Sequence, residues 1–246
     1  MNARPLEGKI AFVTGGSRGI GAAIVRRLGL QGARVTFTYT AAAEAAQALV
    51  VAVTTSGGQA HAVRADSADA RALAVAIDAA AAAHGRLDIL VNNAGVITHG
   101  SVDDLPVEEF DRVFAINVRA VYAGTRAAVK HMGEGGSVIT VGSIVADRSG
   151  FPGTAIYSAS KGAIKSMTRG FARDLGPRGI TVNNVQPGPI ATDMNPAYVE
   201  DLVLPLIPLG RMGQADEIAA MVAYLAGPEA RFTTGASLTV DGGFMS

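Results

Sequence analysis

The sequence predicts an α/β fold, in which helices cover both faces of a doubly wound parallel sheet. Seven short segments rich in apolar and β-branched residues recur along the 246-residue chain, and longer helical segments separate most of them. The expected strands are nearly continuous in apolar residues, as are parallel strands that are buried on both faces. This alternation of strands and helices indicates βαβ units that share one sheet.

The expected elements follow one another without a dividing linker. We expect strands at residues 9–14, 33–39, 59–65, 87–91, 137–141, 180–185 and 236–240, and helices at 22–31, 42–54, 68–83, 107–131 and 157–175. Residues 1–246 are therefore expected to form a single domain. The stretch 187–214 is proline-rich and irregular. Long excursions of this kind are usually functional, so we interpret 188–213 as a substrate loop or lid.

Composition excludes several classes of function. The chain has 21 basic and 21 acidic residues, so it lacks the positive charge that non-specific nucleic-acid binding requires. The absence of cysteine excludes disulfides, thiol catalysis and thiolate zinc sites, and the four histidines show no metal-ligand spacing. We find neither a signal-like N-terminus nor an apolar run of ~20 residues. We expect a cytoplasmic protein without metal, membrane or nucleic acid.

A glycine-rich turn follows the first expected strand and leads into a helix. It reads Thr14-Gly15-Gly16-Ser17-Arg18-Gly19-Ile20-Gly21. Glycines allow a sharp turn close to a pyrophosphate, and a helix N-terminus offers free N–H groups and a favourable dipole. An ordinary turn is the alternative, but the position at the start of a βαβ pattern favours dinucleotide binding. The expected contacts are Gly15, Ser17, Arg18, Gly19, Ile20 and Gly21.

Tyr157 and Lys161 lie four residues apart in an expected helix, so both side chains emerge on one face. A nearby ammonium favours the phenolate of a tyrosine, whose pKa is ordinarily ~10. Tyr157 can then exchange a proton with a substrate oxygen. Ser143 follows the strand 137–141 at the sheet edge where open α/β sheets bind ligands, and its hydroxyl can polarise a carbonyl. A surface pair and a turn serine are the structural alternatives.

Taken together, the motifs resemble those of the short-chain dehydrogenase/reductase family over essentially the whole chain. They are, in order, the Gly-xxx-Gly-x-Gly turn, Asn92-Asn93-Ala94-Gly95, Asn117, Ser143, Tyr157-Ser158-Ala159-Ser160-Lys161 and Pro187-Gly188. The resemblance implies a seven-stranded Rossmann-type fold. It also implies an oxidoreductase that transfers hydride between a nicotinamide cofactor and a carbonyl/alcohol pair.

The resemblance implies catalytic roles for Asn117, Ser143, Tyr157 and Lys161. Asn117 stands within an otherwise good helix, where asparagine is unfavourable because its side chain competes for backbone hydrogen bonds. The family uses this asparagine to disturb the helix and to hold a water in a proton relay through the lysine.

The remaining cofactor contacts also follow from the resemblance. They are Tyr39, Thr40, Asp66, Ser67, Asn93, Ala94, Gly95, Tyr157, Lys161, Pro187, Gly188, Ile190 and Thr192. An acidic residue at the end of the second strand would repel a 2′-phosphate, but Tyr39 and Thr40 stand there. Arg18 is suited to pair with such a phosphate, with a solvated loop residue as the alternative. NADP(H) is the expected cofactor, and NAD(H) is the second candidate.

The expected substrate is an uncharged or hydrophobic ketone or 3-oxo compound. An apolar pocket is predicted from Met194, Leu202, Leu204, Leu206 and Ile207 together with Phe151, Pro152 and Ile156, although these residues suit an oligomer contact equally well. The resemblance extends to 3-oxoacyl-carrier-protein reductases. Glu134 lies near a position where those enzymes carry a basic residue, which argues against a dedicated carrier-protein reductase.

Two further expectations come from the resemblance. Residues 240–244 match a segment that packs across a tetramer interface in the family, so we expect a homotetramer. Residues 145–150 and 185–190 resemble a bacterial branch that includes cyclic-di-GMP-binding biofilm dispersal proteins. The alternative function is therefore a cyclic-dinucleotide-binding regulatory protein on a dehydrogenase fold. The intact set of four catalytic candidates favours the enzyme.

Overall fold

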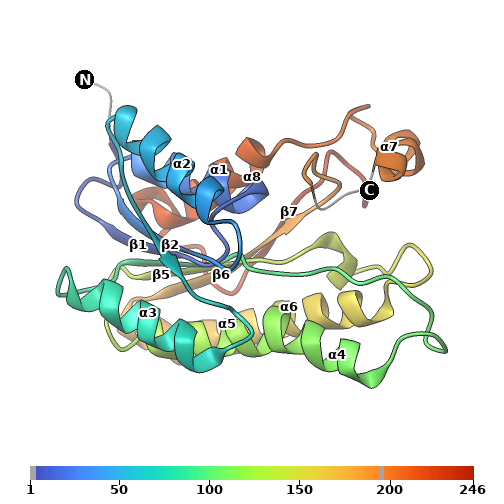
Figure 1. Cartoon of the computed structure of the whole chain (residues 1–246), viewed down its shortest axis with the longest axis horizontal. Helices are drawn as coiled ribbons and strands as arrows, with labels where there is room; N and C mark the ends of the chain where they lie inside the picture. The colour runs from blue at the N-terminus through green and yellow to red at the C-terminus, as the bar shows by residue number, and fades with distance from the viewer. Residues whose placement is uncertain (1–3, 194–196) are drawn as a thin grey trace.

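Seven parallel strands form the centre of the structure, a computed structural model in which residues 4–193 and 197–246 are described. The strand order is β3-β2-β1-β4-β5-β6-β7 (Figure 1). The strands are β1 Ile10–Val13, β2 Arg34–Tyr39, β3 Gln59–Arg64, β4 Ile89–Asn92, β5 Ser137–Val141, β6 Thr181–Pro187 and β7 Ser237–Val240. The order reverses between β1 and β4, where open α/β sheets leave a crevice for ligands.

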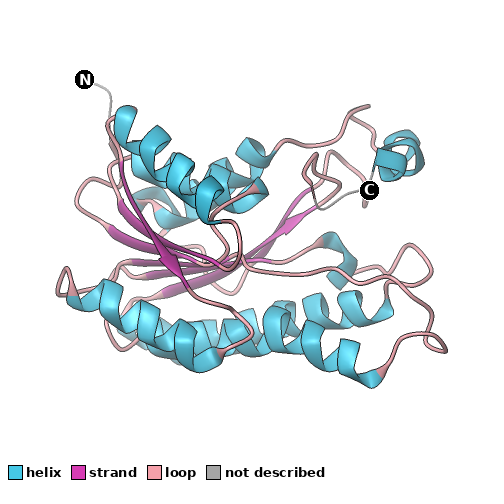
Figure 2. Ribbon diagram, viewed as in Figure 1, coloured by secondary structure: helices cyan, strands magenta, loops and turns pink. Residues whose placement is uncertain are grey.

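Helices cover both faces of this sheet (Figure 2). One face carries α1 Gly19–Leu30, α2 Ala43–Thr55 and α8 Ala215–Ala226, and the other carries α3 Ala70–Ala82, α4 Val107–Phe114, α5 Ala120–Ala128 and α6 Ala155–Leu175. The short helix α7 Ala197–Val203 lies beyond the sheet, near the C-terminus. The predicted doubly wound, seven-stranded fold is confirmed. None of the helices within the described ranges is long and apolar enough to cross a membrane.

Alternate strand residues build the two hydrophobic layers. Val13, Phe37 and Ile139 pack with α1, α2 and α8, whereas their neighbours Phe12 and Val138 pack on the opposite face with α3 and α5. Successive side chains of a strand point to opposite faces, so a fully apolar strand supplies both layers at once. The strands are thereby held from both sides, and their carboxyl ends meet at one rigid edge.

Three parts of the prediction need correction. The expected helix 107–131 is divided into α4, a π-helix at Ala115–Arg119, and α5, which ends at Ala128. The expected irregular stretch 187–214 contains α7. Helix α8 was not predicted, although its signals are present. A capping box joins Gln214 and Glu217 at its start, and buried apolar residues recur along it at helical spacing.

Replacement of Ile139 tests how far β5 depends on the packed layer. Ile139 is fully buried, so Ile139→Ala should lower the free energy of unfolding by about 2–5 kcal/mol through lost contacts and a cavity. Val51 on α2 is 55% exposed, and Val51→Ala should change it by less than about 0.5 kcal/mol. Urea denaturation followed by circular dichroism measures both, and equal effects would contradict the assigned layers.

Candidate active site

A cavity of about 590 Å³ opens at the carboxyl ends of the central strands. It runs from the glycine-rich turn before α1 to the segment after β5 and the loop after β6. Every cofactor residue expected from the sequence lines it, as do Ser143, Tyr157 and Lys161. Asn117 is the exception, since it lies behind the cavity wall. The fold therefore brings together predicted site residues that are up to 177 positions apart in the chain, from Gly15 to Thr192.

The glycine-rich turn has the geometry of a phosphate cradle. Gly15 and Gly19 adopt positive φ angles of 63° and 52°, which favour glycine. A Cβ on Gly21 would lie 2.1 Å from the carbonyl oxygen of Gly15, so any side chain there would separate the turn from α1. Arg18 precedes α1 without a capping side-chain bond, and the first turn holds no acid. The backbone N–H groups of the first turn of α1 are therefore available to an anion.

Two threonines that were not predicted hold this turn in place. The Thr14 hydroxyl accepts hydrogen bonds from the N–H groups of Asn93 (3.0 Å) and Ala94 (2.9 Å). The Thr38 hydroxyl accepts one from the Gly15 N–H at 3.0 Å. Thr14 is the first residue of the predicted turn and Thr38 is an ordinary strand residue, and the sequence alone gives neither hydroxyl a partner. Both join the glycine-rich turn to the neighbouring strands.

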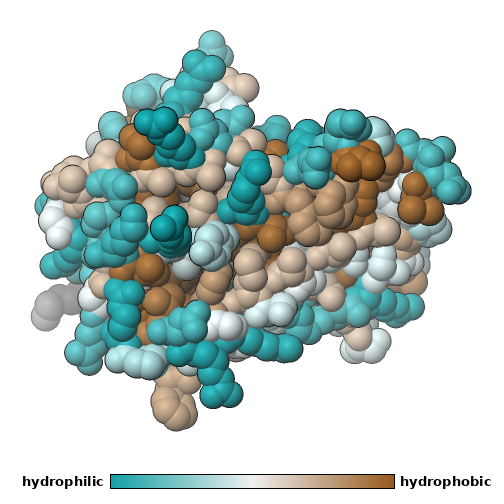
Figure 3. All heavy atoms as spheres, turned by 90° about the horizontal axis from the view of Figure 1, so that it is seen from below, coloured by the Kyte–Doolittle hydropathy of each residue, from teal (hydrophilic) through white to brown (hydrophobic). Residues whose placement is uncertain are grey.

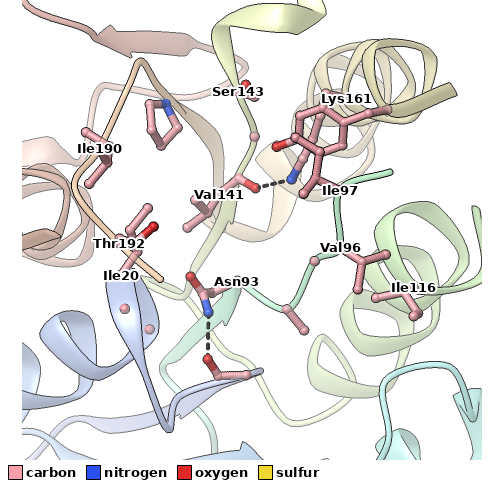
Figure 4. A pocket seen from close by; sticks show the side chains of 18 of the residues that line it. Ile20, Asn93, Val96, Ile97, Ile116, Val141, Ser143, Lys161, Ile190 and Thr192 are labelled. Carbon is pink, nitrogen blue, oxygen red and sulfur yellow. Dashed lines mark hydrogen bonds between the residues drawn. The ribbon is translucent and has the colours of Figure 1, made fainter. Parts of the chain in front are cut away.

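Asn93 connects the end of β4 to the same turn. Its side-chain amide donates hydrogen bonds to the carbonyl oxygens of Thr14 (3.0 Å) and Gly15 (2.8 Å), and Figure 4 shows it extending toward this backbone. The amide nitrogen of Asn93 also approaches Gly21, where a Cβ would lie 2.6 Å from it. Asn93 therefore sets the shape of the cradle through the backbone.

Lys161 is a buried cation next to Tyr157. Its Nζ donates a hydrogen bond to the Val141 carbonyl oxygen at 3.0 Å, at the end of β5 (Figure 4). The same nitrogen lies 5.6 Å from the centre of the Tyr157 ring. Burial lowers the Lys161 pKa to about 8, because the charged form loses hydration. Below that pH the ammonium is retained beside the phenol.

Ser143 and Tyr157 meet at the cavity. Burial raises the Tyr157 pKa, and a hydrogen bond with Ser143 opposes that rise. The Ser143 hydroxyl also accepts a hydrogen bond from the Val145 N–H at 3.3 Å. The phenol is therefore neutral at physiological pH and adjacent to a second hydroxyl. Two O–H groups at one point suit a substrate oxygen that must be bound and then protonated.

Asn117 stands in the π-helix Ala115–Arg119 and is almost fully buried. Its Oδ1 accepts a hydrogen bond from the Val96 N–H, and its Nδ2 donates to the Val96 carbonyl oxygen, both at 2.9 Å. Nδ2 also donates to Ser160 Oγ at 3.0 Å. A Cβ on Gly95 would lie 3.4 Å from Asn117 Oδ1 and 3.6 Å from Lys161 Nζ. Glycine at this position leaves space between the amide and the ammonium.

The apolar end of the cavity differs from the sequence prediction. Phe151 lines it, together with Ile97, Val145, Val203 and Phe244. Leu202 and Leu206 are instead 58% and 50% exposed, and Ile207 is buried against Val203 and Met212. Leu204, Pro152 and Ile156 do not line the cavity either, and Met194 lies outside the described residues.

The reason for this difference is tertiary packing. Val203, at the end of α7, and Ile207, after the 3-10 helix Leu204–Leu206, are buried with Met212, whereas Leu202 and Leu206 are exposed. A run of apolar residues in the sequence does not distinguish these two sets. The prediction of an apolar wall holds, but most of the residues assigned to it were wrong.

Comparison with known proteins decides the family. A family model described as Enoyl-(Acyl carrier protein) reductase matches residues 15–245. A short-chain dehydrogenase/reductase structure from Serratia marcescens BCRC 10948 is 55% identical, with a TM-score of 0.96 over 98% of this chain and 100% of that one. The chain belongs to the short-chain dehydrogenase/reductase family. This membership confirms the predicted family and its oxidoreductase class.

Two further members of the family are similar over nearly their full lengths. The short-chain dehydrogenase from Burkholderia cenocepacia J2315, solved in complex with NADP, is 49% identical, with a TM-score of 0.96 over 98% of this chain and 100% of that one. The cyclic-di-GMP-binding biofilm dispersal mediator protein of Escherichia coli (strain K12) is 49% identical over 239 residues, 96% of this chain and 97% of the relative.

The buried position of Lys161 predicts an unusual titration. The chain has four lysines, so NMR of protein labelled at the lysine ε-carbon resolves them individually. We expect one signal, absent from Lys161→Arg, to titrate with a midpoint of about 8 rather than 10.5. Because burial disfavours the charge, Lys161 should lose its proton as the pH rises through that midpoint. A Lys161 midpoint near 10.5 would contradict the burial described above.

Proposed function

We propose that this protein reduces an uncharged or hydrophobic ketone or 3-oxo compound to the alcohol, with NADPH as the reductant. The observation that carries the proposal is the convergence of Ser143, Tyr157 and buried Lys161 in the cavity that also contains the glycine-rich cradle. A proton donor, a second hydroxyl and a dinucleotide site in one cavity match the requirements of carbonyl reduction.

The cavity fits a phosphorylated dinucleotide. Gly15, Gly19 and Gly21 line the cavity where α1 begins, so a pyrophosphate placed there would meet the backbone N–H groups of the helix N-terminus. Arg18 is exposed at the rim, and Tyr39 and Thr40 replace the acid that would repel a 2′-phosphate. The NADP bound by the Burkholderia relative supports this choice.

The other proposed cofactor contacts lie along the same cavity. Asp66 and Ser67, which follow β3, are proposed to contact the adenine end of the cofactor. Asn93, Ala94 and Gly95 line the middle, and the nicotinamide end is assigned to Tyr157, Lys161, Pro187, Gly188, Ile190 and Thr192. Of the last four, Pro187 ends β6, and the other three lie in the segment that follows it.

Each catalytic residue has a distinct task in the proposed reaction. Bound NADPH supplies the hydride for the carbonyl carbon. The Ser143 hydroxyl donates a hydrogen bond to the substrate oxygen, and the neutral Tyr157 phenol gives that oxygen its proton. The Lys161 ammonium, 5.6 Å from the ring centre, stabilises the resulting phenolate. Asn117 belongs to the path that returns a proton through Lys161, across the space beside Gly95.

Residues 188–213 are proposed to form a lid over the substrate end of a single domain. The base of this segment is closed by hydrogen bonds from the Ala191 N–H to the Gly213 carbonyl oxygen and from the Gly213 N–H to the Pro189 carbonyl oxygen, both 2.9 Å. Val203 and Thr192, within the segment, line the cavity. A segment whose two ends are hydrogen-bonded together, and whose side chains line the cavity, suits a lid that covers a bound substrate.

We also propose a homotetramer. The face covered by α3 to α6 carries exposed apolar side chains (Figure 3), among them Val107 (71%), Phe110 (41%) and Tyr122 (52%). Phe232, near the start of β7, is fully exposed. Exposed apolar side chains of this kind suit an oligomeric assembly, and light scattering of the purified protein measures its size.

The cyclic-dinucleotide regulator remains the weaker candidate. The name of the Escherichia coli relative supports binding of cyclic-di-GMP, but a binding protein needs neither the Tyr157 phenol nor the buried Lys161 amine. Calorimetric titration with cyclic-di-GMP, beside a turnover assay, distinguishes the two functions. Tight binding without turnover would favour the regulator.

Replacement of Tyr157 and Ser143 tests the proposed chemistry. We expect wild-type protein to consume NADPH with at least one ketone of a hydrophobic panel, measured by loss of absorbance. Tyr157→Phe should lower kcat by about 10²–10⁴-fold, because the proton donor is lost. Ser143→Ala should lower it by about 10²–10³-fold, because the substrate oxygen loses a donor. Unchanged kcat in both variants would contradict the assignment.

Arg18 should determine the preference for NADPH. Arg18→Ala removes a charge-assisted contact to a 2′-phosphate, so it should weaken NADPH binding by about tenfold and leave NADH binding unchanged. Fluorescence titration of both cofactors gives the two dissociation constants. Equal weakening of both would show that Arg18 does not recognise the 2′-phosphate.

A further inference from the structure

Gln186 connects β6 to the segment that carries Ser143. It is 1% exposed and immediately precedes Pro187. Its Nε2 donates hydrogen bonds to the Ser143 carbonyl oxygen at 3.0 Å and to Asp147 Oδ2 at 2.9 Å. A buried side-chain amide requires partners, and here both donated bonds go to one neighbouring segment.

Asp147 extends this connection to helix α6. Its other carboxylate oxygen, Oδ1, contacts the Lys165 ammonium. The hydrogen bond from Lys165 is the largest cause of a lowered Asp147 pKa, and Gln186 contributes to the same shift. The Asp147 carboxylate is therefore charged at neutral pH. Only 32% of the Asp147 side chain and 25% of the Lys165 side chain are exposed, which limits screening by solvent.

A third contact fixes the residues between Ser143 and Asp147. The Ser158 hydroxyl, on α6, donates a hydrogen bond to the Val145 carbonyl oxygen at 2.6 Å. Residues 143–147 are thus held by β6 on one side and by α6 on the other. From Asp147 to residue 151 the chain is exposed, so Asp147 makes its contacts where the held segment reaches the surface.

Helix α6 contacts the held segment and carries the proposed proton donor, Tyr157. Lys165 is one turn beyond Lys161, and Lys161 is one turn beyond Tyr157. Lys161 binds the Val141 carbonyl oxygen and Lys165 binds Asp147, so two successive turns of α6 contact the chain before and after Ser143. The distance between the Ser143 and Tyr157 hydroxyls therefore depends on both contacts.

We propose that Gln186, Asp147 and Lys165 form a positioning network that holds the Ser143 hydroxyl at the Tyr157 phenol during turnover. This inference rests on the proposed carbonyl reduction. The network does not touch the substrate, since none of its three members lines the cavity. It acts on the Ser143 backbone, and a small displacement of a catalytic group lowers kcat more than it alters binding.

Kinetics of network variants test the proposal. Gln186→Leu keeps the volume and removes both hydrogen bonds. It should lower kcat for the ketone by about tenfold, with KM changed less than about threefold and the NADPH dissociation constant unchanged. Lys165→Met, on the partly exposed end, should lower kcat by about threefold. Lys165→Arg keeps the ion pair with Asp147 and should therefore have the wild-type kcat.

Asn183 provides a matched control on the same strand. It is fully buried, donates a hydrogen bond to the Thr233 carbonyl oxygen at 2.7 Å and accepts one from the Ala236 N–H at 3.2 Å. Asn183→Ala should reduce stability without lowering kcat. The proposal fails if Gln186→Leu keeps the wild-type kcat, or if kcat falls equally in Asn183→Ala.

Hydrogen exchange separates this proposal from the proposed function. Amides of residues 143–147 should exchange at least about threefold faster in Gln186→Leu and Lys165→Met than in wild type or Asn183→Ala, since the segment loses its ties. Absence of turnover in wild-type protein would overturn carbonyl reduction, and the exchange rates would still decide whether the network holds the segment. Unchanged exchange in both network variants would overturn the network.

Discussion

The site is organised by the burial of one ammonium group. Lys161 is almost removed from solvent, so its charge must be matched by nearby dipoles, and the Val141 carbonyl oxygen at the end of β5 supplies one of them. This contact ties α6 to the end of β5. Tyr157 precedes Lys161 on that helix, and Ser143 lies two residues beyond Val141, just after the strand. The hydrogen bond therefore helps to align the two hydroxyls to which the proposed chemistry is assigned.

Much of the fold and the cavity was predictable, because the determining signals are local. Apolar strands separated by helices specify a parallel sheet, and the turn at Gly15, Gly19 and Gly21 specifies where α1 begins. Tyr157 and Lys161 share a helix, so their proximity follows from the spacing alone. The family likeness then added residues from distant loops, such as Asp66 and Thr192, all of which line the same cavity.

The remainder depends on pairings between segments far apart in the sequence. The partners of Gln186, at Ser143 and Asp147, lie about forty positions earlier and are adjacent only because β5 and β6 pair. The hydroxyls of Thr14 and Thr38 gain their partners only when β1, β2 and β4 come together. The sides of α7 and its neighbouring turn depend on packing against Phe244 and Met212, which periodicity without a known partner cannot orient.

The reversal of strand order between β1 and β4 divides the cavity along the chain. Residues up to Ser67 line the part of the cavity assigned to the phosphates and the adenine, whereas those from Asn93 onward line the part assigned to the nicotinamide and the substrate. The choice of reductant and the choice of substrate are thus encoded in separate lengths of sequence. Mutation can alter one while the other stays intact, which makes this scaffold modular for evolution and for protein engineering alike.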